Sequence, residues 1–356
     1  MREIQVNLSA IKQNYRELKK LVAPVSVMAV VKANAYGHGM LEVAKALEQE
    51  SVDMIGVADL TEAISLRQAG IGVELMCWLL EADDNLELAA VHNVALGIST
   101  MQQLQSVPNS VSIHIKVDTG LGRNGFMPGD LDQVIEHIQT NSLDVRGVFS
   151  HLANTSEAED KKQAEVFDQA LAKFEAADIS VEFRHLAASA GALDYPSMRY
   201  DMVRCGIAIY GLNPFEDKPV EGVVLSPAMR VTSKVINLKS VLAGQGVSYG
   251  YRYRASKPTQ LALVPFGYAE GMPRVSEGAM VKIGSELFPV VGRVAMDQCV
   301  VDVGEASIQL GDEVVIFGDA LNGEPTAEAL GLSSGSINYE IVTRIGGRAR
   351  RVYLEA

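Results

Sequence analysis

Lys32 is the residue whose position in this sequence points most directly to chemistry. The apolar run at residues 25–31 ends on this lysine, and Tyr36 follows among small residues and glycines. A lysine that closes a buried strand is paired with an acid, has a lowered pKa, or forms a Schiff base. A strand-end lysine alone fits a structural ion pair as well as a reactive amine, so the neighbouring residues must decide.

A second charged motif lies between residues 112 and 123. Side chains alternate along a strand, so His114, Lys116 and Asp118 share one face of the strand predicted here. A glycine-rich loop follows and ends at Arg123, whose fork of donors can hold an anion. The alternative is an interior ion pair between Lys116 and Asp118.

Arg204 is the most informative charge in the chain. It stands among apolar residues of a predicted strand, and a buried guanidinium needs a partner. His151 and His185 close two other predicted strands, although a single strand histidine is usually a satisfied polar group of the core.

An alternation of strands and helices must position these residues. The predicted strands are residues 25–33, 53–58, 73–80, 94–99, 111–119, 145–152, 181–188 and 202–211. Helices with apolar residues three and four positions apart fill the gaps, beginning with residues 8–22. Eight such strands predict an N-terminal TIM (β/α)8 barrel, in which Lys32, Asp118, His151, Ser189 and Arg204 fall at C-terminal strand ends, where barrel enzymes carry their chemistry.

The sequence changes character after about residue 212. Short Val- and Ile-rich runs broken by turn residues follow, including a predicted hairpin around Gly284 and Ser285. We expect a barrel domain at residues 9–221 and a C-terminal mainly β domain at residues 222–356. The fold class is therefore α/β plus β.

Composition narrows the classes of function. The 356 residues are 48% hydrophobic and 21% charged, which suits a two-domain enzyme. A net charge of -13 argues against nucleic acid as a partner. No apolar run reaches the length of a membrane span, so we expect a cytoplasmic protein without a membrane partner. Cys77, Cys205 and Cys299 are too scattered for a disulfide framework and are expected to be reduced and packed.

Residues 30–39, VVKANAYGHG, resemble the cofactor-lysine motif of alanine racemases residue for residue. The resemblance implies an isomerase that interconverts L- and D-alanine on pyridoxal 5'-phosphate (PLP), which Lys32 carries as a Schiff base. It also implies a homodimer in which Tyr249 acts as the second catalytic base from the partner subunit. In the resembled family the first residues, here 1–8, join the C-terminal domain. The product D-alanine would serve peptidoglycan synthesis, or the enzyme would serve alanine catabolism.

The same resemblance assigns the remaining site residues, and it implies no metal. Arg204 faces the pyridine nitrogen, His151 hydrogen-bonds that arginine, and His185 packs against the ring. Lys116 is carbamylated and orients Arg123 toward the substrate, whose carboxylate binds the Met296 main chain. The implied cofactor-binding set is Lys32, Tyr36, His151, His185, Ser189, Arg204, Gly206, Ile207 and Tyr339.

Two positions depart from the family pattern, and three other functions stay open. Ala188 stands where many members have Asn, and Met272 stands where a second tyrosine is common, which leaves the entrance gate undefined. The alternatives are a serine or broad-specificity racemase, a decarboxylase of similar build, and a non-catalytic PLP-binding protein. Decarboxylases of this build resemble the usual PLP enzymes, which place an acidic residue beside the pyridine nitrogen where this chain has Arg204. The non-catalytic type lacks a second domain and so has no counterpart of Tyr249.

Overall fold

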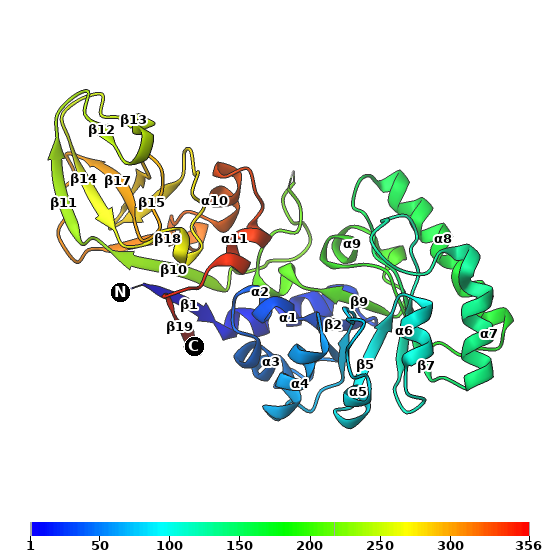
Figure 1. Cartoon of the computed structure of the whole chain (residues 1–356). Helices are drawn as coiled ribbons and strands as arrows, with labels where there is room; N and C mark the ends of the chain where they lie inside the picture. Colours follow the sequence, from blue (N-terminus) through cyan, green and yellow to red (C-terminus); the bar gives the residue numbers. More distant parts are fainter. Residues whose placement is uncertain (1, 217, 356) are drawn as a thin grey trace.

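The computed structural model describes residues 2–216 and 218–355, and it shows a chain in two parts. In Figure 1 a barrel of strands and helices lies beside a β-rich part, and both chain ends lie where the two parts meet. The predicted TIM barrel followed by a mainly β domain is confirmed.

The barrel is one sheet of eight parallel strands in the order β8-β7-β6-β5-β4-β3-β2-β9. An isolated bridge between Ala188 and Arg204 joins its two edges and closes the ring. The strands are β2 (Ser26–Val30), β3 (Met54–Val57), β4 (Leu75–Cys77), β5 (Val94–Ile98), β6 (Ile113–Lys116), β7 (Val145–Phe149), β8 (Phe183–His185) and β9 (Met202–Cys205).

All eight strands were predicted, but most end several residues earlier than expected. The strand predicted at 25–33 ends at Val30, and the strand predicted at 202–211 ends at Cys205, where a 3-10 helix soon begins. Apolar residues continue past these strand ends because the loops that follow are also buried. Periodicity therefore overestimated the strands at the end where the site lies.

The longer helices cover the outside of the barrel, whereas short segments such as α2 (Lys32–Tyr36) follow the C-terminal ends of the strands. In α1 the Asn7 side chain accepts a hydrogen bond from the Ala10 backbone N–H and caps the N-terminus, and the predicted apolar face is buried. The barrel helices are α1 (Leu8–Val22), α2 (Lys32–Tyr36), α3 (Met40–Glu48), α4 (Leu60–Gln68), α5 (Glu87–Val91), α6 (Met101–Ser106), α7 (Leu131–Asn141), α8 (Glu157–Ala176) and α9 (Ser189–Asp194), with 3-10 turns η1 (Pro128–Asp130), η2 (Pro196–Met198) and η3 (Ile207–Tyr210).

The barrel interior is filled by a separate apolar cluster that is rich in methionine. Its members are Met28, Met54, Met76, Ala95, Phe149 and Met202, with Trp78 and Phe183 packed against them. Flexible methionine side chains fill an irregular interior well. This packing gives the end of the barrel that carries the site a solid floor.

The β-rich part contains a six-stranded sheet in the order β16-β15-β18-β10-β1-β19, a three-stranded sheet β11-β14-β17 and a β12-β13 pair. The predicted hairpin at Gly284 and Ser285 joins β15 to β16. The strands are β1 (Glu3–Asn7), β10 (Met229–Lys234), β11 (Asn237–Val241), β12 (Gly246–Val247), β13 (Tyr253–Arg254), β14 (Thr259–Val264), β15 (Met280–Ile283), β16 (Glu286–Pro289), β17 (Cys299–Gly304), β18 (Glu313–Phe317) and β19 (Arg350–Leu354). The helical segments are α10 (Ala327–Ser333), α11 (Asn338–Arg344), η4 (Tyr249–Tyr251), η5 (Tyr268–Glu270) and η6 (Ala320–Asn322).

The two ends of the chain connect the two parts. Strand β1 pairs with β10 and with the last strand β19, although the helix that follows it belongs to the barrel. Cys77, Cys205 and Cys299 are buried and unpaired, as predicted. Within the described residues, we find no helix with the length and apolar character that a membrane crossing requires.

Candidate active site

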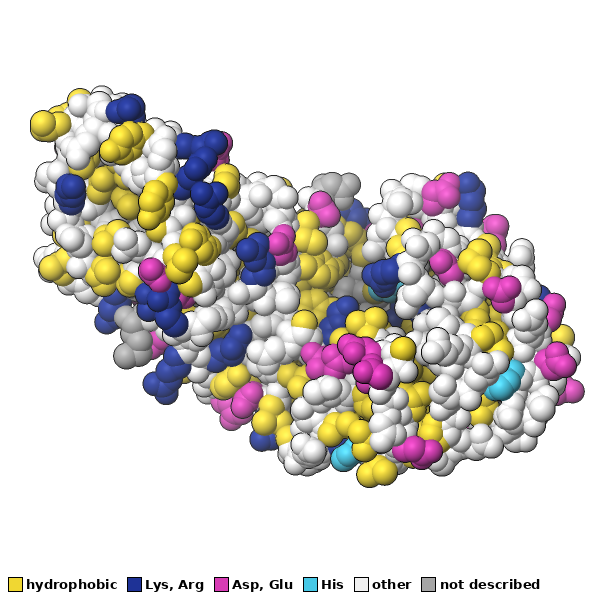
Figure 2. Space-filling view, viewed as in Figure 1, with side chains coloured by type: hydrophobic (Ala, Val, Ile, Leu, Met, Phe, Trp, Pro, Cys, Tyr) yellow, Lys and Arg dark blue, Asp and Glu magenta, His cyan; other side chains and the backbone are white. Residues whose placement is uncertain are grey.

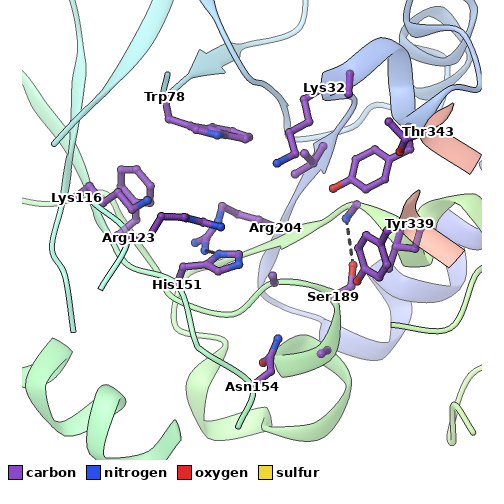
Figure 3. Close-up of a pocket in the computed structure, with 18 residues that line it drawn as sticks. Lys32, Trp78, Lys116, Arg123, His151, Asn154, Ser189, Arg204, Tyr339 and Thr343 are labelled. Carbon is purple, nitrogen blue, oxygen red and sulfur yellow. Dashed lines mark hydrogen bonds between the residues drawn. The ribbon is translucent and has the colours of Figure 1, made fainter. Parts of the chain in front are cut away.

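A cavity of about 410 Å³ opens at the C-terminal ends of the barrel strands. Figure 3 shows that the labelled side chains surround it from several strands and from α11 of the second part. The surface is hollowed where the barrel meets the second part, with Lys and Arg side chains nearby (Figure 2). Its polar and aromatic lining consists of Lys32, Tyr36, Trp78, Lys116, Arg123, Phe149, His151, Asn154, Ser189, Arg204, Tyr339 and Thr343, beside the backbone of Gly206 and Ile207.

Lys32 stands two residues after β2, and its amine projects into the cavity (Figure 3). The amine lies 5.9 Å from the centre of the Trp78 ring, at cation–π distance. Burial and the nearby Arg123 charge lower its pKa, which favours a free amine. An amine of this kind can act as a nucleophile or as a base.

One end of the cavity is a narrow cradle with hydroxyl groups. A Cβ at position 206 would lie 2.3 Å from the Tyr36 hydroxyl, so only glycine fits against that side chain. The Gly206 backbone N–H donates to Ser189 Oγ at 3.1 Å. Tyr339 completes the cradle from α11, with its ring centre 6.2 Å from that of Tyr36. Burial raises the pKa of both phenols, so they remain hydrogen-bond donors.

Arg204 is buried and fixed by backbone carbonyls. Its Nη2 donates to the carbonyls of Ser150 at 2.6 Å and Leu186 at 3.0 Å, and its Nη1 donates to that of His185 at 2.8 Å. No carboxylate of the described residues lies within salt-bridge distance of it. Burial lowers its pKa only to about 10, so it stays charged at neutral pH. The cavity therefore has a fixed cation in its wall without an acidic partner.

The histidines differ in their access to the cavity. His151 lines it and accepts from Arg204 through Nδ1 at 3.1 Å. His185 is fully buried and also lies 3.1 Å from the guanidinium through Nδ1. His185 does not line the cavity, and its ring stacks on that of Phe149, which does. Its packing against a cofactor ring stays a prediction.

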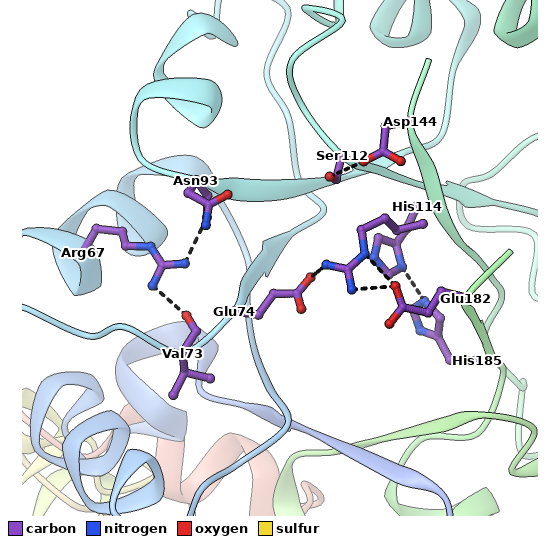
Figure 4. Close-up of polar contacts among 10 residues, drawn as sticks. Arg67, Val73, Glu74, Asn93, Ser112, His114, Asp144, Glu182 and His185 are labelled. Carbon is purple, nitrogen blue, oxygen red and sulfur yellow. Dashed lines mark hydrogen bonds and ion pairs between the residues drawn. The ribbon is translucent and has the colours of Figure 1, made fainter. Parts of the chain in front are cut away.

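A chain of rings continues below Arg204. Because a guanidinium only donates, His185 Nδ1 accepts and His185 Nε2–H must donate to His114 Nδ1, 2.9 Å away (Figure 4). Burial lowers the pKa of His114 to about 3 and that of His185 far below its usual range. These rings stay neutral, so the positive charge remains on Arg204.

Lys116 and Asp118 do not form the interior ion pair that was the alternative interpretation of this motif. Lys116 is buried and its amine contacts the Asn124 side chain, whereas Asp118 accepts from the Gly120 and Gly122 backbone at 3.0 and 3.1 Å. No salt bridge within 4.0 Å joins the two in the described chain. Burial and the charges of Arg123 and Arg204 lower the Lys116 pKa to about 8. About a tenth of this amine is therefore unprotonated at pH 7, far more than for an ordinary lysine.

Two expected site residues lie outside this cavity. Tyr249 begins η4 between β12 and β13, in the part of Figure 1 most distant from the barrel, and is 67% exposed. Met296 is 54% exposed. The two segments are nevertheless linked, since Ser248 Oγ donates to the Arg293 carbonyl at 2.6 Å. Both residues are therefore exposed on the second part, on two segments that contact each other.

Several residues of the site escaped sequence analysis. Trp78 is the only tryptophan in the chain, and its place after a barrel strand was a signal that could have identified it. Asn154 and Asn124 lie on loops, where residue type alone gives no such signal. Met272 is fully buried in the apolar core, so it does not line an entrance in this chain.

A Schiff-base cofactor with a phosphate fits the residues present. The cavity offers an amine at Lys32, a fixed cation at Arg204 and a donor-rich cradle that a Cβ at Gly206 would fill. Its charged lining groups are lysines and arginines, which suits an anionic ligand. The fold and cavity define a class: a barrel enzyme with a reactive amine that acts on a small anionic molecule.

Comparison with known proteins identifies the family. The family model "Alanine racemase, N-terminal domain" matches residues 6–214, and "Alanine racemase, C-terminal domain" matches residues 228–353. The alanine racemase of Beutenbergia cavernae is 40% identical over 365 residues, covering 98% of this chain and 97% of that protein. The crystal structure of alanine racemase from Streptomyces lavendulae superposes with a TM-score of 0.96 at 38% identity, covering 100% of this chain and 97% of that one.

The chain belongs to the alanine racemase family. It is an isomerase that interconverts L- and D-alanine, and its family depends on PLP and supplies D-alanine.

Proposed function

We propose that this cavity binds PLP and that Lys32 holds it covalently. The observation that carries the proposal is that one cavity is lined by the Lys32 amine, the Arg204 cation and the hydroxyl cradle of Tyr36, Ser189 and Tyr339. In this assignment the cradle and the backbone amides of Gly206 and Ile207 hold the phosphate. When bound, PLP withdraws electrons from the substrate Cα and so acidifies its proton.

The residues of the chain would then perform three tasks. Arg204 keeps its own protons, so a ring nitrogen beside it receives none, which favours proton return to Cα over transamination. His151 orients the guanidinium from the cavity side, and His185 acts on it from below rather than touching the ligand. Lys32 Nζ takes or returns the proton on one face of Cα.

We further propose that the opposite face is served by Tyr249 of a second copy in a homodimer. Two observations support this assignment: Tyr249 and Met296 are exposed, and both lie outside the cavity of their own chain. Met296 would present its main chain to the substrate carboxylate. The proposal divides the chain into a PLP-binding barrel at residues 9–221 and a β domain at residues 222–356 with the first eight residues, whose β1 pairs with β10 and β19.

Lys116 is proposed to be carbamylated. An uncharged amine adds to carbon dioxide with loss of one proton and becomes a carbamate anion. The lowered pKa of Lys116 makes that amine available, and the charges of Arg123 and Arg204 would stabilise the anion. The carbamate would then orient Arg123 toward the substrate carboxylate.

Reductive labelling tests the cofactor assignment. Purified protein should show a visible absorbance band, and borohydride followed by peptide mass mapping should place a reduced PLP adduct on Lys32. Lys32→Ala should lose both the band and the adduct. Lys116→Ala is the matched control, because it removes the other lysine that lines the cavity and should keep both the band and the adduct on Lys32. A band retained in Lys32→Ala, or an adduct on Lys116, would reject the assignment.

A further inference from the structure

The backbone that follows Lys32 has the opposite hand to an ordinary helix. Ala33, Asn34, Ala35 and Tyr36 have φ values of 53°, 55°, 54° and 51°, and Gly37 continues with φ 81°. L-residues avoid this region because Cβ crowds the following carbonyl, and Asn tolerates it better than the others. A left-handed turn of this length needs contacts from other elements to hold it.

Glu62 of α4 holds the start of this turn. Its Oε1 accepts from the Ala33 backbone N–H at 2.7 Å, and its Oε2 accepts from the Ala58 backbone N–H at 2.9 Å. Glu62 is itself fixed, because its own N–H donates to Asp59 Oδ1, the cap of α4, at 2.9 Å. One half-buried carboxylate therefore ties the residue after Lys32 to the loop that follows β3.

The end of the turn is held by the second part of the chain. Arg351 Nε of β19 donates to the Gly37 carbonyl at 2.8 Å. A Cβ at position 37 would lie 2.2 Å from the Val342 carbonyl oxygen of α11, so the turn packs directly on that helix. Both ends of the segment between Lys32 and Tyr36 are thereby fixed.

This segment sets the relative positions of the two groups assigned to opposite parts of PLP. Lys32 provides the amine, and Tyr36 provides a hydroxyl of the phosphate cradle. Rotation of the Ala33 peptide would move both groups together, and the Glu62 carboxylate opposes that rotation through a charge-assisted hydrogen bond.

We propose that Glu62 is a positioning residue for Lys32: it fixes the left-handed turn and places the amine for attachment of PLP. The proposal rests on the assignment of Lys32 as the PLP-bearing lysine. Glu62 does not line the cavity, so it acts through Lys32 rather than on the ligand.

The Glu62 charge also acts on the amine. Burial lowers the pKa of Lys32, Arg123 and Arg204 lower it further, and Glu62 raises it, while Lys116 and His151 share the same cavity. Loss of the Glu62 charge should therefore shift the Lys32 pKa further down. A residue with a purely structural role would not produce this shift.

Glu62→Gln is the test variant, and Glu48→Gln is its matched control. A glutamine keeps one acceptor oxygen but places an NH2 group against the second backbone N–H, and it removes the charge. Glu48 is also half-buried on a barrel helix, and it accepts from the Gly72 and Val73 backbone at 2.7 and 3.2 Å. Those residues precede β4, so Glu48 lies at the opposite end of the barrel strands.

Two measurements on the full-length protein separate the variants. Cofactor-free protein is titrated with PLP while Trp78, the only tryptophan and a cavity residue, reports binding by fluorescence quenching. The rate of PLP attachment is then followed against pH, since only the unprotonated amine reacts. Glu62→Gln should weaken PLP binding about tenfold and move the pH midpoint of attachment downward, whereas Glu48→Gln should change neither.

Equal affinity and an unchanged midpoint in Glu62→Gln and Glu48→Gln would overturn the proposal. If Glu62→Gln fails to fold, Glu62→Asp provides the test: it keeps the charge but shortens the reach, so it should weaken PLP binding and leave the midpoint near that of the wild type. Wild-type affinity in Glu62→Asp would then count against the role. Lys32→Ala is measured alongside to test the assignment of Lys32 itself. If PLP still attaches to Lys32→Ala, that assignment is wrong, whatever the result for Glu62→Gln.

Discussion

The cavity of the barrel and the exposed turn at Tyr249 are opposite kinds of functional region. Barrel groups such as Lys116 and Arg204 are buried, and burial and the nearby Arg123 charge lower the pKa of each. Tyr249 and Met296 are more than half exposed, and both lie on the surface of the second part. This difference is what the proposed homodimer would require: one chain lines the cofactor pocket, and its exposed Tyr249 and Met296 would serve the pocket of a second copy.

Replacing Tyr249 should produce the largest effect that leaves the barrel untouched. Tyr249→Phe should lower racemisation roughly 1,000-fold, because one of the two bases is lost. The visible band and PLP affinity should stay at wild-type levels, since Lys32 and the hydroxyl cradle assigned to PLP are unchanged. Exchange of the Cα proton with deuterated solvent should persist for one alanine enantiomer and disappear for the other. Loss of the band would show that Tyr249 is needed to hold the cofactor, which would contradict its assignment as a base that acts only on the substrate.

Arg204→Glu should act inside the barrel with a different signature. An acid can leave a proton on the ring nitrogen, so racemisation should fall roughly 100-fold while pyruvate formation by transamination rises. Pyruvate is measured with a coupled dehydrogenase, and thermal unfolding serves as the control because Arg204 holds three backbone carbonyls. Unchanged pyruvate formation in a folded variant would contradict the role given to this cation.

Lys116→Ala should have a smaller effect that can be reversed. Without an anion to orient Arg123, activity should fall about tenfold, and added acetate or chloride should restore part of it. Wild-type activity should also fall in carbon dioxide-free buffer. If small anions and carbon dioxide removal both leave activity unchanged, the carbamate is not formed.

The smallest expected effect concerns stability. The Lys116 pKa is about 8 in the folded chain and about 10.4 when unfolded, so the unfolded state binds more protons between these values and stability rises with pH. Cofactor-free Lys116→Met should lack this contribution, and the difference in melting temperature between wild type and variant should change by about 2 °C from pH 8 to pH 10. A constant difference would show that Lys116 carries an ordinary pKa.

Sequence reasoning was most successful where periodicity governs structure. The eight barrel strands, the α1 face and the Gly284 hairpin follow from apolar spacing and turn residues, and all are present. The resemblance located Lys32, Tyr36, Ser189 and Arg204, which the fold brings to one cavity. It could not predict that His151 lines the cavity while His185 is fully buried. Both histidines lie at the end of a barrel strand, and only tertiary packing decides which ring is exposed to the cavity.

Other features depend on contacts between distant segments. The left-handed turn after Lys32 leaves no periodic pattern, and residues 33 to 36 include no glycine that would suggest positive φ. Glu62 reads as an ordinary polar residue of a helix until the fold places it against the Ala33 N–H. Such roles follow from tertiary structure and could not have been derived from local spacing.

The central claim is that each active site combines the barrel of one chain with the β domain of another. Lys32→Ala and Tyr249→Phe are each expected to be inactive, but a mixed dimer of the two contains one site with both defects and one intact site. Co-expression in equal amounts puts half of the protein in mixed dimers, so activity should recover to about a quarter of wild type in a two-fold assembly. Activity that stays at the level of the two parents, with mixed dimers confirmed by mass, would show that both residues serve the same chain and would contradict the account.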